Sequence, residues 1–174
     1  MPADDTSLTN ALRDAVQAAS GDEQARQAVE KIYQDLAAQV EERRPLCIVS
    51  GRCCRFEEYG HRLYVTTLEL AAFLNGFDAL SKPATLTASI ENWDGAGCPF
   101  QVAKLCGVHS LRPFGCRIYF CDATSTQWQQ DAYDQFHGRL KRLHEELAVP
   151  YFYVEWRQAL RALLPLPTRS PVEE

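Results

Sequence analysis

The chain contains 174 residues, of which 46% are hydrophobic, and its formal net charge is −5. A chain of this length can bury its own core, so we expect a single domain over residues 1–165 that folds without disulfides. It contains no apolar run of about 18 residues, and its acidic N-terminus lacks the pattern of a secretory signal, so we expect a cytoplasmic protein without a membrane partner. The acidic balance gives no indication of a nucleic-acid partner.

The N-terminal arm, residues 1–46, is free of cysteine and is predicted to form two helices. Apolar residues recur at helical spacing over residues 8–19 and again over residues 25–40. Ser20 and Glu23 fit a capping box at the start of the second helix, and Pro45 ends it. Residues 1–42 carry nine acidic and three basic side chains, which favours a solvated face; docking of a basic protein partner is the alternative.

The middle of the chain, residues 47–121, contains all seven cysteines and is less regular. Residues 61–66 have the branched and aromatic content of a short strand. Thr66 and Glu69 fit a capping box for a helix over residues 68–75, which Gly76 would close.

The second half of this region is predicted to be mostly loop. Residues 82–97 form a long connection with a helical turn near residues 90–93, and two short strands are expected over residues 98–108. Arg112-Pro113 precedes a short helix that contains Cys116, because proline is tolerated in a first turn.

The C-terminal arm, residues 122–165, is predicted to be helical over residues 133–147 and again from residue 156 to Pro165. His137 and His144 lie on the apolar stripe of the first of these helices, so we interpret them as core or edge residues and not as ligands. Residues 166–174 are expected to be a disordered tail. The predicted fold is mainly α with a small antiparallel β element (α+β), in which helical arms surround an irregular, cysteine-rich metal-binding centre.

The cysteines fall into two groups in loop-rich, glycine-containing sequence. Buried apolar side chains, a redox disulfide pair and metal ligands are three uses that such thiols can have. Two separated groups of ligands, brought together by folding, are typical of small metal sites, so the pattern favours metal binding. The first group is Cys47, Cys53 and Cys54, and the second is Cys98, Cys106, Cys116 and Cys121.

Basic residues accompany both groups. Arg52 and Arg55 flank the first group, and residues 98–121 contain Lys104, Arg112 and Arg117 but no acidic residue. Nearby cations lower thiol pKa values and stabilise a site that is rich in thiolates. We therefore expect Arg112 and Arg117 to lie directly behind the metal ligands.

The order of these residues resembles a known family. The segment Cys47-Ile-Val-Ser50-Gly-Arg-Cys53-Cys54 is similar to the CxxCxxCC signature of the YkgJ-type cysteine-cluster proteins, which are described as chelating zinc or iron. The later cysteines, with Arg112-Pro113 and Cys116-Arg117 between them, resemble the second half of that family's pattern. The resemblance covers residues 47–121 and implies a zinc or iron site made by these cysteines.

The chain departs from this pattern at Ser50, which stands where the family has its second cysteine. Serine is a poor ligand for soft-metal sites, so this position removes one expected ligand. The flagellin lysine methylases carry a similar domain, but no glycine-rich nucleotide loop follows a strand here, so methylation is not inferred.

The ligands are expected to be four or more of the seven cysteines, since four thiolates suit either zinc or an iron–sulfur cluster. His109 follows Cys106 by three residues and is a less favoured additional ligand, which would allow two zinc sites. Sequence alone does not separate zinc from an iron–sulfur cluster.

The expected function is therefore that of a metal-binding protein that holds an iron–sulfur cluster or zinc between two half-sites, with a redox or electron-transfer role open to it. A cysteine-dependent redox enzyme or a metal-assisted modifying enzyme is one alternative, although no acid–base pair is recognisable. An interaction module with structural zinc and a protein partner is the other alternative.

Overall fold

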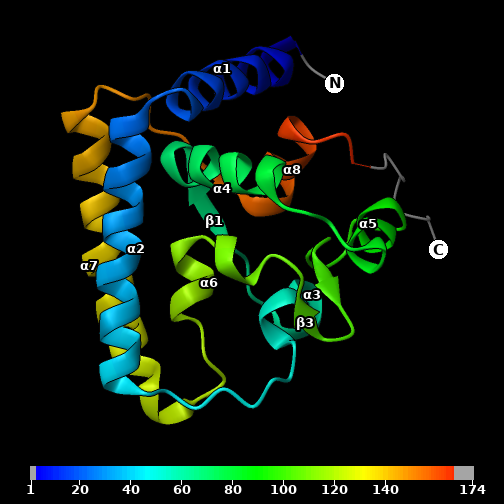
Figure 1. Ribbon diagram of the computed structural model, residues 1–174, viewed down its shortest axis with the longest axis vertical. Helices are drawn as coiled ribbons and strands as arrows, with labels where there is room; N and C mark the ends of the chain where they lie inside the picture. Colours follow the sequence, from blue (N-terminus) through cyan, green and yellow to red (C-terminus); the bar gives the residue numbers. More distant parts are fainter. Residues whose placement is uncertain (1–2, 167–174) are drawn as a thin grey trace.

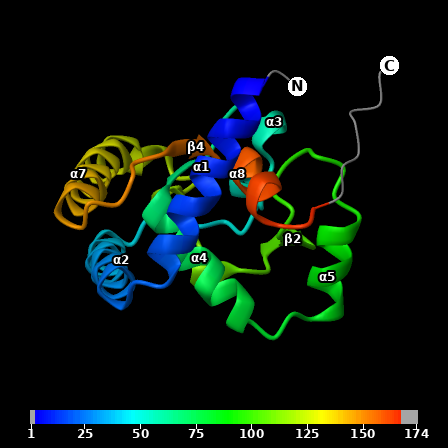
Figure 2. The ribbon, with the colours of Figure 1, turned by 90° about the horizontal axis from the view of Figure 1, so that it is seen from above.

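Two long helices stand side by side and antiparallel along one edge of the computed structural model, which describes residues 3–166 (Figure 1). They are α2 (Glu23–Arg43) and α7 (Thr126–Glu146), and Figure 2 shows them end-on, across the molecule from α5 (Ala84–Glu91). An ion pair of 2.6 Å joins Arg139 Nη2 on α7 to Asp35 Oδ2 on α2. The two helices turn apolar faces to the core, with Val29, Ile32, Leu36, Phe136 and Leu140 buried.

The helix α1 (Ala3–Ser20) packs along α4 (Thr67–Ala79), as Figure 1 shows. Its apolar stripe buries Val16 and Ala19, and Asn75 Nδ2 on α4 donates a hydrogen bond of 3.0 Å to the Ser20 carbonyl. The two helices predicted for the N-terminal arm are therefore present, and α4 supports the first of them.

The predicted capping box of Ser20 and Glu23 is wrong. The helix α1 extends through Ser20, whose hydroxyl donates to the Val16 carbonyl at 2.8 Å. Asp22 caps α2 instead, because its carboxylate accepts hydrogen bonds of 2.8 and 3.1 Å from free backbone N–H groups of the first turn.

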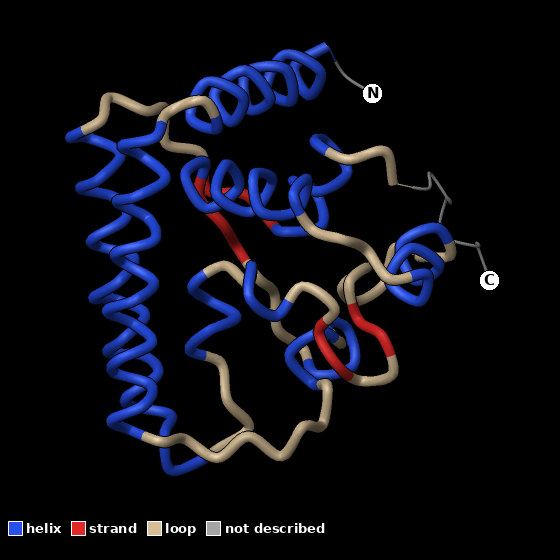
Figure 3. Tube along the Cα trace, viewed as in Figure 1, coloured by secondary structure: helices blue, strands red, loops and turns tan. Residues whose placement is uncertain are grey.

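Two small antiparallel sheets complete the fold (Figure 3). The strand β1 (Tyr64–Thr66) pairs with β4 (Tyr153–Glu155), which lies far along the chain, and β2 (Gln101–Val102) pairs with β3 (Leu105–Cys106) in a hairpin. The mainly α fold with a small antiparallel β element is confirmed. The strand β4 is an element that the sequence did not predict.

The capping box of Thr66 and Glu69 is confirmed at the start of α4. Glu69 Oε2 accepts from the Thr66 backbone N–H at 2.9 Å, and Oε1 accepts from the Phe114 N–H at 3.0 Å at the start of α6 (Phe114–Ile118). The carboxyl is buried, and burial raises the pKa of Glu69 to about 7. One side chain therefore fixes the beginnings of two helices.

Two predicted boundaries in the middle of the chain are wrong. The helix α4 continues past Gly76, where a Cβ would collide with the Leu111 side chain, so this glycine serves close packing and not termination. The stretch 82–97 contains α5, which begins earlier than the helical turn expected near residues 90–93.

The C-terminal arm has the expected helices, α7 and α8 (Trp156–Leu163), and α8 is capped by the Glu155 carboxylate. His144 is buried, with Nδ1 3.1 Å from the Val149 carbonyl oxygen, and His137 stacks on Tyr153, so both are core or edge residues as expected. The expected disordered tail lies almost wholly outside the described residues. Four short helical turns complete the path: η1 (Arg52–Cys54), α3 (Phe56–Tyr59), η2 (His109–Leu111) and η3 (Ala123–Ser125).

A cluster of aromatic side chains connects the hydrophobic core at α4 with the cysteine region. The Phe73 ring lies 4.9 Å from Trp156 and 5.3 Å from Phe100, between ring centroids. Phe100 and Trp156 also line the cysteine cavity described below. Within residues 3–166, no helix has the length and apolar character needed to cross a membrane.

Candidate metal centre

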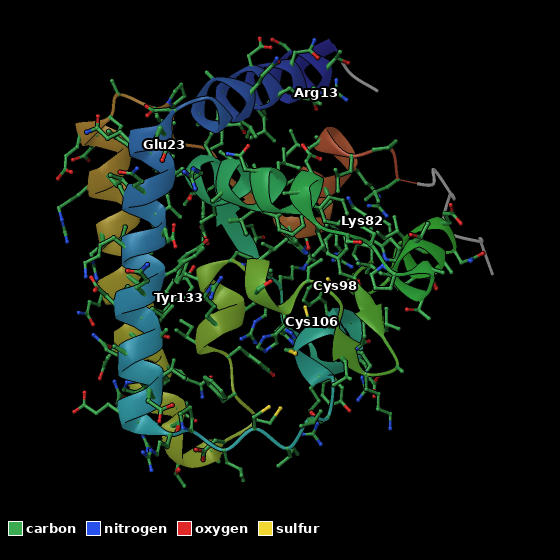
Figure 4. All side chains as sticks on the ribbon, in the orientation of Figure 1. Arg13, Glu23, Lys82, Cys98, Cys106 and Tyr133 are labelled. Atoms are coloured by element: carbon green, nitrogen blue, oxygen red, sulfur yellow. The ribbon has the colours of Figure 1, made fainter. Side chains whose placement is uncertain are left out.

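Five of the seven cysteines line one small cavity of about 20 Å³. They arrive from four separate segments of the chain, namely η1, the loop before β2, the strand β3 and the helix α6. Figure 4 shows two of them, Cys98 and Cys106, near the middle of the molecule between α6 and the β2–β3 hairpin. The five are Cys53, Cys54, Cys98, Cys106 and Cys116, and we refer to them as the five-cysteine cluster.

Gly51 allows η1 to approach the hairpin that carries Cys106. Its φ is +73°, and a Cβ there would lie 2.6 Å from Gln101 Nε2 and 2.9 Å from the Lys104 carbonyl oxygen. Without a side chain, the Gly51 carbonyl instead accepts a hydrogen bond of 2.9 Å from Gln101 Nε2. Glycine at this position therefore brings the two cysteine-bearing segments together.

Gly97 has the same role for Cys98. Its φ is +61°, and a Cβ would lie 2.8 Å from the Cys54 carbonyl oxygen. That carbonyl accepts a hydrogen bond of 2.8 Å from the Cys98 backbone N–H. The two cysteine groups of the sequence are thus joined by a direct main-chain contact.

Apart from Arg112, the walls of the cavity between the thiols are apolar, so the thiols lie in surroundings of low dielectric constant. The apolar walls are contributed by Phe56, Phe100, Val108, Pro113 and Trp156. Burial in these surroundings raises the pKa of the Cys116 thiol well above its ordinary value.

The other thiols influence one another. Hydrogen bonding with Cys54 lowers the pKa of Cys53 to about 6 and that of Cys106 to about 7. The pKa of Cys54 itself is raised, first by its hydrogen bonding with Cys106. The cluster therefore combines thiols that ionise readily with thiols that hold their protons.

Arg112 is the cation of the site. Its positive charge lowers the pKa of both Cys53 and Cys106, and its Nη1 donates to the Cys116 carbonyl at 3.3 Å. It also lines the cavity.

Arg117 acts at one remove from the thiols. Its Nε donates to the Arg112 carbonyl at 2.6 Å, and its Nη2 donates to the Ser110 carbonyl at 2.7 Å. The guanidinium also lies over the Tyr33 ring, 4.3 Å from the centroid. Arg117 therefore holds the loop before Cys116 and does not line the cavity.

Cys47 and Cys121 lie outside the cavity lining. Cys47 is exposed in the extended segment after α2, and the Leu46 N–H donates to Asp122 Oδ2 at 3.1 Å. Cys121 Sγ is 3.4 Å from Ser50 Oγ, so the serine of the CxxCxxCC-like segment faces this cysteine. His109 is exposed on η2 and is also absent from the lining.

The five thiols share a cavity but do not form a finished ligand sphere. Within the described part of the chain, no group of three or more His, Cys, Asp or Glu side chains is arranged to hold a metal ion. A metal would require some of the cysteine side chains to turn toward a common point.

No family model, curated protein or solved structure matches this chain. The resemblance to the YkgJ-type proteins therefore stays a prediction from the cysteine pattern.

Several contacts that shape the site were missed at the sequence level. Glu69 fixes the start of α6, and Trp156 closes the cavity from the far end of the chain. His61 stacks on Tyr119, with 4.8 Å between ring centroids, and its Nε2 lies 3.4 Å from the Cys53 carbonyl oxygen. The capping role of Glu69 was visible in the sequence, but its second contact with Phe114 depends on the tertiary fold.

Proposed function

We propose that this protein binds a single metal ion, with zinc as the best candidate, through four thiolates of the five-cysteine cluster. The observation that carries the proposal is the convergence of five cysteines from four chain segments on one cavity. Arg112 would offset the negative charge of the thiolates, and the apolar walls would exclude water.

The size of the cavity favours one ion over a cluster. A volume of about 20 Å³ is close to the space that a single water molecule occupies in a cavity. An iron–sulfur cluster would require the four segments to move apart, whereas a single ion requires only rotation of cysteine side chains. Zinc held by four cysteines would stabilise the packing of those segments, as in closed structural sites.

A reducing compartment such as the cytoplasm fits this proposal. All seven cysteines are free thiols, and thiols have to be unoxidised to bind zinc. The redox or electron-transfer role considered above would require the iron–sulfur form, because zinc has no redox chemistry of its own.

The test is metal analysis of protein purified anaerobically with a reductant. We expect a colourless protein with one equivalent of zinc and no iron. The double variant Cys98→Ser/Cys106→Ser leaves three thiols in the cavity and is expected to lose the zinc. The matched control, Cys47→Ser/Cys121→Ser, removes two thiols outside the cavity and is expected to keep it.

Three results would contradict the proposal. Brown protein with visible absorption and stoichiometric iron would assign an iron–sulfur cluster. Equal loss of zinc from both double variants would show that the cavity is not the binding site. Absence of any metal, together with thiols that titrate at low pH, would favour the cysteine-dependent redox enzyme. Circular dichroism of each variant checks that the helices are retained.

A further inference from the structure

A second and much larger cavity adjoins the five-cysteine cluster. It has a volume of about 570 Å³ and lies between the α3–β1 segment and the segment that joins α6 to α7. Cys53 and Cys116 line both cavities. Its volume falls in the range of about 300–1,000 Å³ that is usual for small-molecule sites, so it can accommodate an organic ligand beside the thiols.

The walls of this pocket offer flat aromatic surfaces. His61 and Tyr119 are stacked nearly parallel, with an interplanar angle of 17°, and both line the pocket. Tyr59, Phe120 and Tyr133 contribute further rings to the lining. Such walls favour a ligand with a planar ring, because ring stacking adds to the burial of apolar surface.

Two guanidiniums in the lining have donors free to meet a ligand. Arg52 and Arg62 line the pocket, and within residues 3–166 neither guanidinium forms an ion pair or a hydrogen bond to another residue. The Arg52 guanidinium lies over the Tyr59 ring, 4.8 Å from the centroid, so it is held beside the aromatic wall.

The acidic residue in the lining, Asp122, is already occupied. Its carboxylate accepts hydrogen bonds from the Thr124 N–H and hydroxyl, from the Ser125 hydroxyl and from the Leu46 N–H. These donors bind both of its oxygens, at 2.6–3.1 Å, whereas the two guanidiniums keep all of their donors. Asp122 keeps its negative charge, but its oxygens are already bonded, so Arg52 and Arg62 are lining groups with free donors for an acid group.

We infer that this pocket binds a small organic anion that carries an aromatic ring. The acid group would be held by Arg52 and Arg62, whose guanidiniums match the geometry of carboxylate or phosphate oxygens. The ring would lie against the aromatic walls. The ligand would then sit directly beside Cys53 and Cys116. The pocket adjoins the metal site and shares Cys53 and Cys116 with it. The arginines and rings that would hold the ligand belong to the pocket alone, so ligand binding does not depend on metal binding.

The test compares three ligands that share one ring system and differ in charge. Isothermal titration calorimetry of the 174-residue protein as purified would measure the binding of 2-naphthoate, 2-naphthamide and protonated 2-naphthylmethylamine. We expect the carboxylate to bind at least about tenfold more tightly than the neutral amide, because a hydrogen-bonded charge pair is worth that much in affinity. The ammonium compound is expected to be the weakest of the three.

Variants locate the binding site. Arg62→Gln and Arg52→Gln are each expected to reduce the affinity for the carboxylate by about tenfold while leaving the affinity for the amide unchanged. Arg142→Gln, an exposed position on α7 outside the pocket, is the matched control and is expected to change neither affinity.

Equal affinities for the three ligands, or no binding of the carboxylate, would overturn the inference. An effect of Arg142→Gln equal to that of Arg62→Gln would do so as well, because it would reflect the overall charge alone. The double variant Cys98→Ser/Cys106→Ser, which is expected to lose zinc, separates the two proposals because it should still bind the carboxylate more tightly than the amide. Retained selectivity in a wild-type protein without zinc would refute only the metal site, and zinc without selectivity would refute only the pocket.

Discussion

The backbone N–H of Cys98 donates to the carbonyl oxygen of Cys54 at 2.8 Å, and this bond joins the two cysteine groups that the sequence keeps far apart. The contact depends on the residue before Cys98. Gly97 has a φ of +61°, and its α-carbon faces the same carbonyl. The geometry of the candidate metal centre is therefore sensitive to a residue that is not itself a ligand.

Gly97→Ala is expected to destabilise the fold by about 3 kcal/mol, since it adds a collision with the Cys54 carbonyl to the cost of a left-handed alanine. It should also weaken zinc binding. Gly60→Ala is the control, because Gly60 has a φ of +65° but no atom within 4 Å of the point where a Cβ would lie. Its cost is expected to be about 1 kcal/mol, with unchanged zinc affinity. Urea unfolding measures the stability of the two variants, and zinc competition measures their zinc affinity. Equal effects of the two substitutions would argue against this role of Gly97.

The buried carboxyl of Glu69 should make stability depend on pH. Its pKa is raised to about 7 in the folded protein from an ordinary value of 4.5, so the folded state binds more protons between these values. The contribution of Glu69 to the free energy of unfolding is then fully present below pH 4.5 and is lost as the pH rises through 7. The total loss is about 3 kcal/mol if the full shift is realised.

The comparison of wild type with Glu69→Gln isolates this effect, because glutamine does not titrate. Urea unfolding at a series of pH values measures the free energy of unfolding of both proteins. As the pH rises from 4.5 to 8, the wild type should lose stability relative to the variant. A difference that stays constant over this range would mean that the folded carboxyl titrates near its ordinary pKa.

Arg112 should set the reactivity of the thiols in the metal-free protein. Its charge lowers the pKa of Cys53 and Cys106, so Arg112→Gln is expected to raise the pKa of both thiols. Alkylation of the variant at pH 6 should then be slower by roughly threefold. Arg112→Lys keeps the charge and is expected to lie between the variant and the wild type. The ultraviolet absorbance of the thiolates against pH is the measurement, and a downward shift in Arg112→Gln would contradict the assignment.

Ser50→Cys should create a new cross-link. Ser50 Oγ lies 3.4 Å from Cys121 Sγ, so the introduced thiol would be near enough to form a disulfide with Cys121 when oxidised glutathione accepts the two electrons. Closing so long a loop would stabilise the fold by up to about 4 kcal/mol. Peptide mapping identifies the bond, Ser50→Cys/Cys121→Ser should not form it, and a bond from the introduced thiol to Cys47 would show a different arrangement.

Local patterns predicted most of the helices but not the contacts between distant segments. The capping box of Thr66 and Glu69 is a short-range signal, and it is present as predicted. The strand β4 was missed although residues 151–154, Tyr-Phe-Tyr-Val, have the aromatic and branched content of a strand. Its partner β1 lies far away in the chain, so no hairpin pattern marked the pairing. Gly76 was misread as a helix end because its reason for being glycine is the Leu111 side chain, which comes from another segment.

The cysteine pattern indicated the region that contains the small cavity, but not which cysteines line it. The sequence divides the cysteines into three and four, whereas the fold divides them into five that share a cavity and two that do not. Cys47 lies outside the cavity, in the extended segment after α2, where the Leu46 N–H donates to Asp122. Cys121, the residue before Asp122, faces Ser50 of the same segment. The spacing of the cysteines carries no information about this hydrogen bond between Leu46 and Asp122.

The position of Trp156 has a consequence for protein synthesis. This residue closes the cavity and follows all seven cysteines, so it leaves the ribosome after every thiol has already emerged. Chains are made at about 5–20 residues per second, and a nascent chain would present its cysteines for several seconds before the last wall is in place. During that interval the thiols can react with a metal donor or with an oxidant. Whichever arrives first would determine whether each new molecule binds metal or is oxidised.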